Sequence, residues 1–306
     1  MLNTKNRTLY IIIAILLVAL IVMIVKTNIK GERTFRKSLC EFNPEDIDKI
    51  EIVDNNSLIK FIKDGAIWRV AKDAESYKAD IQTVESILKD LSTMNIQRVV
   101  SRDKSKLQEN EIDDSLGTRI KLFSKNKQLT DLVIGRFSYR QTGQGGIQLS
   151  TMVRLANEYD VYSIEGSLSM SVRRDFDGFR DKTIAKFDPE NVQNIEFSYP
   201  ADSSFTLTRS GDIWLINQDT VEIGKVVNYL NDIKDARANA FATDFNPENA
   251  ELFELKATFS GEQPLTIKAF KQGEKYLFLS AQNESTLSDS EHIFRRLFVS
   301  KNKFAK

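Results

Sequence analysis

The side chains that could carry chemistry in this chain are few and scattered. His292 is the single histidine and Cys40 the single cysteine among 306 residues, whereas zinc centres usually combine several such ligands. His292 lies in SDSEHIFRRLF, a stretch with helical apolar spacing, and no G-x-S-x-G elbow offers a serine nucleophile. We interpret His292 as a surface residue near a helix end. We predict no catalytic residue, no cofactor and no metal site, so the protein is not expected to be an enzyme.

Acidic stretches could suggest a cation site or a pair of catalytic carboxylates. The nearest approach to a calcium loop is Asp175, Asp177 and Gly178, but the closing glutamate of that pattern is missing. Turn chemistry is the preferred interpretation of these acids. A carboxylate-based hydrolase stays open as a minor alternative, because the separation of two carboxylates in space decides that chemistry and a sequence does not give it.

The segment TGQGG at 142–146 invites comparison with a phosphate-binding loop. That loop requires Lys-Ser/Thr directly after its last glycine and then a helix, whereas this sequence continues as IQLSTM, which is typical of a strand. We predict a flexible hairpin tip instead. Because loop tips often carry binding function, Gly143, Gly145 and Gly146 are candidate partner-binding residues.

Two pairs of arginines accompany predicted helices at similar places. One pair ends a helix expected near 165–173, and the other lies in a helix expected at 288–298. Capping is the simpler interpretation, since cations are favourable near helix C-termini. A surface that binds a partner is the alternative. The candidate partner contacts are therefore Arg173, Arg174, Arg295 and Arg296.

The longest apolar segment lies near the N-terminus. Residues 9–25 (LYIIIAILLVALIVMIV) would span about 26 Å as a helix, close to the ~30 Å of bilayer hydrocarbon. We predict an N-terminal single transmembrane helix that contacts the lipid bilayer, within an anchor covering residues 1–30. A cleaved signal peptide is the alternative, although KTNIKGERTF lacks an A-x-A site. A lipoprotein is disfavoured because KSLC has no small residue directly before Cys40.

Charge leaves the orientation of this helix open. Lys5 and Arg7 precede it, whereas residues 26–37 carry five basic residues against Glu32, so the positive-inside count favours a cytoplasmic downstream flank. The short N-terminal tail is instead typical of a signal anchor. The chain has 43 basic and 43 acidic residues, a balance that argues against nucleic acid as a partner.

The rest of the chain is predicted to contain two tandem repeat units. Four segments recur in the same order, at offsets of 136 to 146 residues. The pairs are 42–52 with 187–197, 64–70 with 210–216, the apolar positions of 81–91 with those of 223–233, and 121–134 with 257–270. We predict a first unit over residues 35–182 and a second over 183–306. Arg180-Asp181-Lys182 is expected to tie them together through charge-assisted bonds.

Each unit is expected to be α+β, with antiparallel strands and covering helices. Asn43 and Asp188 precede Pro-Glu and are typical helix N-caps, and FNPEN at 245–249 repeats that signal. Asp80 is expected to cap an amphipathic helix over 80–94. The residues expected in the cores are Trp68, Trp214, Phe61, Leu88 and Leu230.

The order of these motifs resembles the family called domain of unknown function 4340. The resemblance covers about residues 35–300 and rests on F-x-P-E-x-[IV]-x-x-I-E, the Gly-x-[IV]-Trp hairpin, the L-x-x-L helix, VIG at 133–135 and FRDKTI at 179–184. It implies a membrane-anchored protein whose soluble part lies outside the cytoplasmic membrane, beside the permease and ATPase subunits of a gliding-motility-type ABC transporter. The family supplies no established catalytic residues. The second unit lacks clear counterparts of VIG and TGQGG.

The sequence therefore favours a membrane-anchored, extracytoplasmic, non-catalytic interaction or accessory protein associated with an ABC transporter or envelope complex. Its expected location is the cytoplasmic membrane, crossed once, with a periplasmic C-terminal region. The alternative is a module that binds an envelope polymer or a small ligand in a cleft between the two units, because domain interfaces favour pockets.

Overall fold

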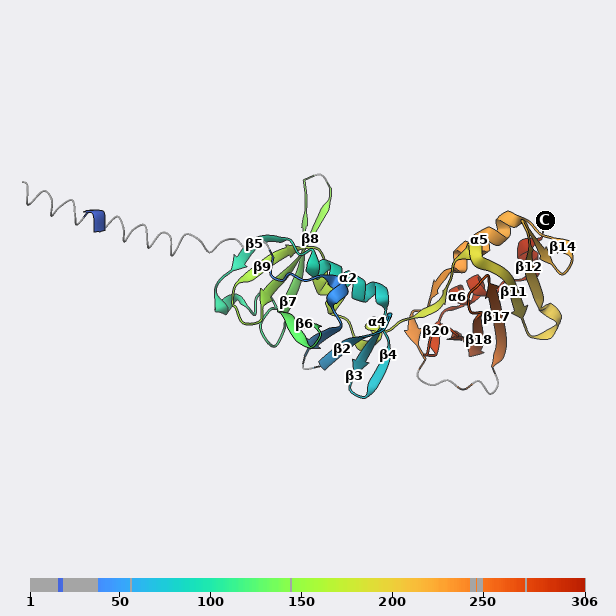
Figure 1. Ribbon diagram of the computed structural model, residues 1–306, viewed down its shortest axis with the longest axis horizontal. Helices are drawn as coiled ribbons and strands as arrows, with labels where there is room; N and C mark the ends of the chain where they lie inside the picture. The colour runs from blue at the N-terminus through green and yellow to red at the C-terminus, as the bar shows by residue number, and fades with distance from the viewer. Residues whose placement is uncertain are drawn as a thin grey trace, which may run out of the picture.

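The computed structural model describes residues 16–18, 38–55, 57–143, 145–242, 246, 250–272 and 274–305. It is mostly β, with two large antiparallel sheets of nine strands each and some helices. Figure 1 shows two lobes in series, which we call the N-terminal lobe (residues 38–179) and the C-terminal lobe (residues 183–305). The predicted antiparallel strands are confirmed, although strands outweigh helices more than an α+β class implies.

Most of the apolar run at 9–25 lies outside the described residues. In the ranges given above, no helix is long and apolar enough to cross a membrane. The transmembrane helix thus stays a prediction from the sequence. The same holds for the third Asn-Pro signal at 245–249, of which the structure describes only Asn246.

The sheet of the N-terminal lobe has the strand order β4-β3-β2-β1-β6-β7-β8-β9-β5. Its strands are β1 (Lys49–Asp54), β2 (Ser57–Asp64), β3 (Ile67–Lys72), β4 (Glu75–Lys78), β5 (Ile96–Ser101), β6 (Thr118–Ser124), β7 (Lys127–Gln141), β8 (Ile147–Leu155) and β9 (Val161–Glu165). The helices of this lobe are η1 (Pro44–Asp46), α2 (Ile81–Ser92), η2 (Lys104–Lys106), α3 (Leu168–Val172) and α4 (Phe176–Phe179).

The sheet of the C-terminal lobe has the strand order β14-β13-β12-β11-β17-β18-β19-β20-β16. Its strands are β11 (Val192–Ser198), β12 (Phe205–Ser210), β13 (Ile213–Ile216), β14 (Asp219–Thr220), β16 (Ala240–Phe241), β17 (Glu251–Phe259), β18 (Leu265–Gln272), β19 (Lys275–Ser280) and β20 (Leu287–Asp289). Beside it, β10 (Thr183–Lys186) pairs with β15 (Asp235–Arg237). The helices are η3 (Pro189–Asn191), η4 (Ala201–Ser203), α5 (Ile223–Ile233), α6 (Glu291–Leu297) and η5 (Lys301–Phe304).

The two sheets have the same strand order. In each, the first four strands form a meander and the chain then leaves through a covering helix. After α2 the chain joins the opposite edge as β5, whereas after α5 it first forms β15, which pairs with β10, and then joins the opposite edge as β16. Two-residue turns set the register of the matching hairpins: Gly65 follows β2 with φ of 60° and Gly211 follows β12 with φ of 61°. Glycine suits both positions because a positive φ strains other residues.

Equivalent strands bury equivalent side chains. Ile50 and Ile52 of β1 are 1% exposed, and so are Ile195 and Phe197 of β11, 145 residues later. Trp68 and Trp214 are each 5% exposed, and Phe61, Leu88 and Leu230 are also buried, so all five core predictions are confirmed.

The β-ladders correct one of the sequence offsets. Ile50 pairs with Leu122 in the N-terminal lobe, and Ile195 pairs with Ala257 in the C-terminal lobe. Leu122 and Ala257 are 135 residues apart, whereas the match of 121–134 with 257–270 implies 136. Because side chains alternate between the faces of a strand, a slip of one residue would place every core residue of β17 outside.

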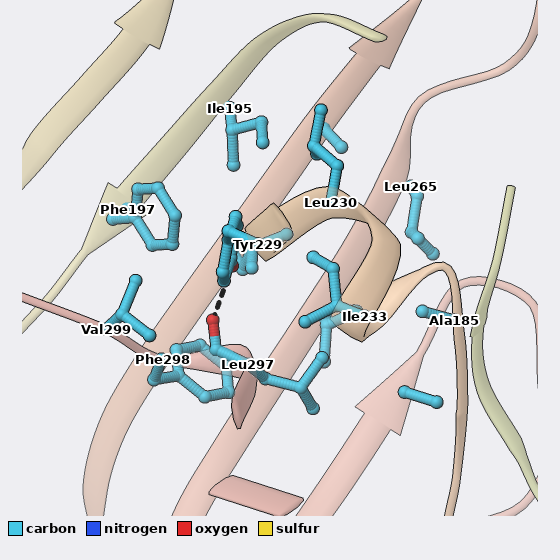
Figure 2. Packing of buried hydrophobic residues seen from close by; sticks show 14 of the residues in the cluster. Ala185, Ile195, Phe197, Tyr229, Leu230, Ile233, Leu265, Leu297, Phe298 and Val299 are labelled. Atoms are coloured by element: carbon cyan, nitrogen blue, oxygen red, sulfur yellow. Dashed lines mark hydrogen bonds between the residues drawn. The ribbon is translucent and has the colours of Figure 1, made fainter. Parts of the chain in front are cut away.

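The covering helices match at the predicted offset of 142. Val84, Ile87, Leu88 and Leu91 of α2 are buried, as are Val226, Tyr229, Leu230 and Ile233 of α5. Each lobe has its own hydrophobic core beneath its helix. In the C-terminal core the Tyr229 hydroxyl donates to the Leu297 carbonyl at 2.6 Å (Figure 2).

The predicted caps are also confirmed. Asn43 accepts from the Glu45 N–H, Asp188 from the Glu190 N–H, and Asp80 from the Gln82 N–H. The helix expected at 288–298 is shorter, because β20 occupies 287–289 and α6 begins at Glu291. The helix expected near 165–173 is α3.

Candidate functional site

The junction between the lobes is the most densely bonded polar region that joins distant parts of the chain. Arg180 lies at its centre, with its guanidinium carbon 3.6 Å from the Tyr77 ring centroid and 3.7 Å from the Phe241 ring centroid. Tyr77 belongs to β4 of the N-terminal lobe and Phe241 to β16 of the C-terminal lobe. The guanidinium also donates to Asp177 at 2.7 Å and to Ser285 at 2.9 Å. Arg180 therefore joins the two lobes, as its position in the sequence predicts.

Asp181 is buried beside Arg180. Its carboxylate accepts from the Thr183 N–H and hydroxyl, and it forms an ion pair with Lys78 at 3.0 Å. Burial alone would raise the pKa of Asp181, but these hydrogen bonds and the Lys78 ammonium outweigh burial and hold the pKa below its ordinary value. The charged form of Asp181 is thus the form that the junction stabilises.

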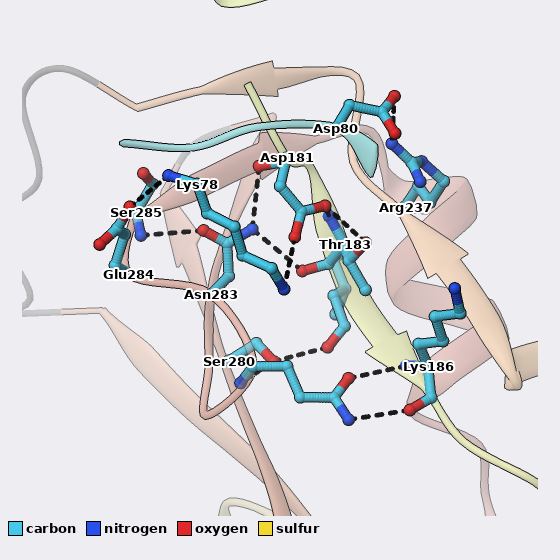
Figure 3. A network of polar contacts seen from close by, with 12 residues as sticks. Lys78, Asp80, Asp181, Thr183, Lys186, Arg237, Ser280, Asn283, Glu284 and Ser285 are labelled. Atoms are coloured by element: carbon cyan, nitrogen blue, oxygen red, sulfur yellow. Dashed lines mark hydrogen bonds and ion pairs between the residues drawn. The ribbon is translucent and has the colours of Figure 1, made fainter. Parts of the chain in front are cut away.

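The loop at residues 280–285 of the C-terminal lobe bonds to the end of β4 (Figure 3). Glu284 accepts from the backbone N–H of Lys78 at 2.5 Å and forms an ion pair with Arg69 at 3.2 Å. Asn283 donates to the carbonyls of Asp181 and Thr183 at 3.0 and 3.2 Å. Since the bonds to Arg69 and Lys78 reach the N-terminal lobe and the bond to Asp181 reaches the connecting segment, this loop fixes one side of the junction.

A pocket of about 320 Å³ lies at this junction. Its lining residues are Lys78, Ala79, Asp80, Ile81, Asp181, Thr183, Lys186, Arg237 and Gln282. Lys78 forms an ion pair with Asp181, and Arg237 forms one with Asp80. The Gln282 side-chain amide accepts from the Lys186 N–H and donates to the Lys186 carbonyl, both at 2.8 Å. Most polar groups around the pocket are therefore engaged with one another.

The glycines predicted as partner contacts lie at the tip of the β7–β8 hairpin. The Thr142 N–H donates to the Gly146 carbonyl at 2.8 Å, and Gly145 has φ of 77°. A Cβ at Gly143 or Gly145 would meet no atom within 4 Å, so the space around both residues is open. Backbone conformation explains the glycine at 145, and exposure keeps the tip available to a partner.

The arginine pairs do not come together, and they differ in what they contact. Arg173 donates to the Leu116 carbonyl at 2.8 Å and to Glu111 at 2.9 Å, so it holds a neighbouring loop rather than the end of its own helix. Arg174 donates to the Thr83 hydroxyl at 3.2 Å. Arg173 is the C-cap residue of α3, as the capping interpretation places it, but the hydrogen bonds of its side chain go to other segments.

The second pair is divided between two roles. Arg296 donates to the Asp232 carbonyl, so it caps the last turn of α5 rather than of its own helix. Among the described residues, Arg295 pairs within α6, with Glu291 at 2.9 Å, and its side chain is 73% exposed. Of the four arginines, Arg295 is the one best placed to meet a partner.

The other residues that the sequence singled out for possible chemistry are Asp175, His292 and Cys40, and they lie far apart in the chain. Asp175 accepts from the Gly178 N–H at the start of α4, as the turn interpretation predicts. His292 is exposed on α6. Cys40 is buried, and burial raises the pKa of its thiol to about 11. Among the described residues, no group of three or more His, Cys, Asp and Glu side chains could hold a metal ion.

Sequence reasoning missed most partners of the junction. No short sequence pattern marks these partners, because their contacts join residues far apart in the chain. They are Arg69, Tyr77, Arg237, Phe241 and Glu284. The short loop at 280–285 carries several hydrogen-bonding side chains, which was the only available indication.

The fold defines a class of mostly-β proteins with two nine-stranded antiparallel sheets of one topology, connected in series. The family model described as domain of unknown function (DUF4340) matches residues 68–258. Because the match covers more than half of the chain, the chain belongs to the DUF4340 family, as the sequence motifs predicted. No curated protein and no solved structure matches it.

Proposed function

We propose that this chain is a membrane-anchored, extracytoplasmic interaction protein without catalytic activity, which associates with an ABC transporter or another envelope complex. The observation that carries the proposal is the pairing of charged side chains at the junction between the lobes. Most charged side chains where a ligand cleft was expected are paired: Asp80 with Arg237 and Arg69 with Glu284 across the lobes, and Lys78 with Asp181 of the connecting segment. The outer surfaces of the two lobes are then left for binding.

The proposal includes the tandem organisation and the anchor. The shared strand order and the matching buried residues support two repeat units, over residues 35–182 and 183–306. The apolar run at 9–25 supports a single transmembrane helix that holds these units against the cytoplasmic membrane, with the lobes in the periplasm.

Affinity purification of the full chain from detergent-solubilised membranes tests the partner. Recovery of a permease and an ATPase in fixed stoichiometry is expected. The Arg295→Glu variant should reduce that recovery if α6 contributes to the contact, whereas Lys256→Glu, on the exposed side of β17, serves as the matched control. Recovery of no membrane protein from either preparation would overturn the proposal.

A reporter fused after Lys306 tests the location. Activity of a periplasm-dependent reporter is expected, together with sedimentation of the full-length chain with membranes. A mature chain that lacks its first thirty residues and stays in the soluble fraction would exclude the anchor.

The junction pocket favours a second candidate, a binding module for a small ligand or an envelope polymer. The lining residue Lys186 has an exposed side chain, for which the described residues provide no hydrogen bond or ion pair. Retention of the chain on envelope polysaccharide, abolished by Lys186→Glu and kept in Lys256→Glu, would favour this module over the transporter partner.

A further inference from the structure

The β7–β8 hairpin extends well beyond the sheet of the N-terminal lobe. We call the segment Phe137–Thr151 the hairpin arm; its strands pair from Phe137 with Thr151 out to Gln141 with Ile147. Ser150 and Thr151 also pair with β9, so the three outer pairs, from Tyr139 with Leu149 to Gln141 with Ile147, project beyond the sheet by roughly 10 Å at 3.4 Å per residue. Figure 1 shows the arm standing away from the other strands of the lobe.

One face of the arm is apolar and exposed. Tyr139 lies opposite Leu149, and Ile147 lies two residues from Leu149, so the three side chains share a face. Tyr139 is 73% exposed and Ile147 is 67% exposed, which makes them the two most exposed large apolar side chains in the described ranges. Leu149 is 36% exposed. Such exposure near a polar tip is typical of a binding surface.

The opposite face of the arm is polar. Ser138 bonds Ser150 at 2.8 Å, and Arg140 donates to Gln148 at 3.1 Å. From residue 132 to residue 157 the sequence contains no Asp or Glu. The arm therefore combines an aromatic and aliphatic face with a positive charge, which is the composition of segments that lie at the boundary of anionic lipid headgroups.

The described part of the C-terminal lobe has no such arm. Its equivalent hairpin closes directly, with Gln272 paired to Lys275 at the end of β18 and β19. The arm is thus confined to the lobe that follows the apolar run in the sequence. Since the topology of the two sheets is otherwise shared, the arm is an addition specific to the lobe nearest the proposed anchor.

The length of the connecting segment limits how far the start of the N-terminal lobe can lie from the bilayer. Twelve residues lie between Val25 and Ser38, and their thirteen steps at about 3.4 Å each reach at most about 45 Å. Five of the residues at 26–37 are basic, so the same membrane face is expected to attract them if it is anionic. A tether of this length also raises the effective concentration of lipid around the arm, so a weak contact suffices.

We propose that the hairpin arm inserts its Tyr139, Ile147 and Leu149 face into the headgroup region of an anionic lipid bilayer. This contact gives the N-terminal lobe a second attachment to the membrane and fixes its tilt. The inference rests on the proposed anchor, because the anchor brings the arm to the lipid.

A fluorescent probe at position 147 tests the contact in the full chain. Cys40→Ala provides a cysteine-free background, and Ala185, the equivalent of Cys40 in the C-terminal lobe, is fully buried there, so alanine fits such a site. Ile147→Cys then carries an environment-sensitive dye. Ile213→Cys, 45% exposed in the C-terminal lobe, carries the same dye as the matched control.

The labelled chains are reconstituted into vesicles of phosphatidylcholine with or without phosphatidylglycerol. We expect a blue shift of the probe at 147 and its quenching by lipid spin-labelled near the headgroup, both stronger with phosphatidylglycerol. The probe at 213 should show neither. Tyr139→Ser with Leu149→Ser, and separately Arg140→Glu, should reduce the quenching at least twofold.

Three further outcomes would contradict either the lipid contact of the arm or the anchor. If the chain floats with the vesicles but the probe at 147 behaves like the probe at 213, the arm does not touch lipid and the inference is wrong, while the anchor stands. A probe at 147 that is shielded only after a transporter subunit is added assigns the arm to a protein partner and also overturns the inference. A chain that does not float overturns the anchor itself.

Discussion

Asp80 of the N-terminal lobe and Arg237 of the C-terminal lobe form an ion pair, with 2.8 Å between Oδ2 and Nη2. The other oxygen of the same carboxylate accepts from the Gln82 N–H and caps α2. One side chain therefore starts the covering helix of one lobe and contacts the other lobe. The equivalent residue before α5, Glu222, makes no side-chain cap.

Substitutions at Asp80 should separate these two roles. Asp80→Ala removes cap and ion pair and is expected to lower the free energy of unfolding by about 1–2 kcal/mol, measured by urea denaturation. Asp80→Asn keeps a capping oxygen and should cost less than about 1 kcal/mol. Glu222→Ala is the control with no cap to lose. Equal losses for the Asn and Ala variants would mean that the ion pair, rather than the cap, dominates.

Arg180 should set the relative orientation of the lobes. Arg180→Ala loses its contacts with the Tyr77, Phe241 and Phe176 rings and two hydrogen bonds, and a stacked cation contributes about 0.5–2 kcal/mol. We expect broader distances between spin labels placed at positions 60 and 256, measured by pulsed electron resonance in the Cys40→Ala background. Arg295→Ala should leave the distances unchanged. An unaltered distribution in Arg180→Ala would show that the Glu284 loop and the Asp80–Arg237 ion pair hold the lobes without Arg180.

Asp181 should make the stability depend on acid pH. Its folded-state pKa lies below the 3.8 of an unperturbed aspartate, so the unfolded chain takes up a proton more readily than the folded chain. The stabilisation is therefore complete above about pH 5 and is lost as the pH falls through the folded pKa. Asp181→Asn is expected to flatten this part of the curve of unfolding free energy against pH. A wild-type slope in the variant would contradict the assignment.

Arg173 should matter for folding, whereas Arg295 should not. Reversing the charge at 173 leaves the carbonyl of Leu116 and the carboxylate of Glu111 without their donor. Both groups are partly exposed, so a loss of about 0.5–1.5 kcal/mol is expected, which lowers the melting temperature by a few degrees. Arg295→Glu, exposed on α6, should shift it by about 1 °C or less. Matching melting curves for both variants would refute the structural role of Arg173.

The Tyr229 hydroxyl should contribute to the C-terminal core beyond its ring. Burial raises the pKa of Tyr229 well above its ordinary value, so the hydroxyl stays protonated and donates to Leu297. Tyr229→Phe leaves that buried carbonyl without its donor and should cost about 1–2 kcal/mol in urea denaturation. Tyr159→Phe, at a side chain 50% exposed, is the control. A neutral Tyr229→Phe would indicate that water replaces the donor.

Local and periodic features of the fold could be predicted from the sequence. Asp80, Asn43 and Asp188 act on backbone groups within three residues, so their capping roles follow from short patterns. Trp68 and Trp214 are buried because the hairpins alternate with period two. The register of β17 was missed because Phe-Ser (123–124 and 259–260) and Leu-Thr (129–130 and 265–266) recur in both units and favoured an offset that is one residue too large. The bulge in the β6–β7 pairing has no signal in the sequence.

The junction could be predicted only in part. Arg180-Asp181-Lys182 drew attention as a charged run between two units, and the structure places Arg180 and Asp181 in contact with both lobes. Their partners could not be found, since 206 residues separate Lys78 from Glu284 and no periodic pattern relates them. Long-range pairs of this kind depend on how two complete lobes meet.

The order of the strands has a mechanical consequence. Each sheet is built from one continuous stretch of sequence, so the polypeptide passes from one lobe to the other once, through Arg180–Lys182. A pull on the C-terminal lobe against a fixed N-terminus therefore loads that short passage and the pairs beside it. Under such tension the contacts between the lobes would share the force and would break before either sheet begins to shear. These contacts are those of Glu284, Arg237 and Phe241.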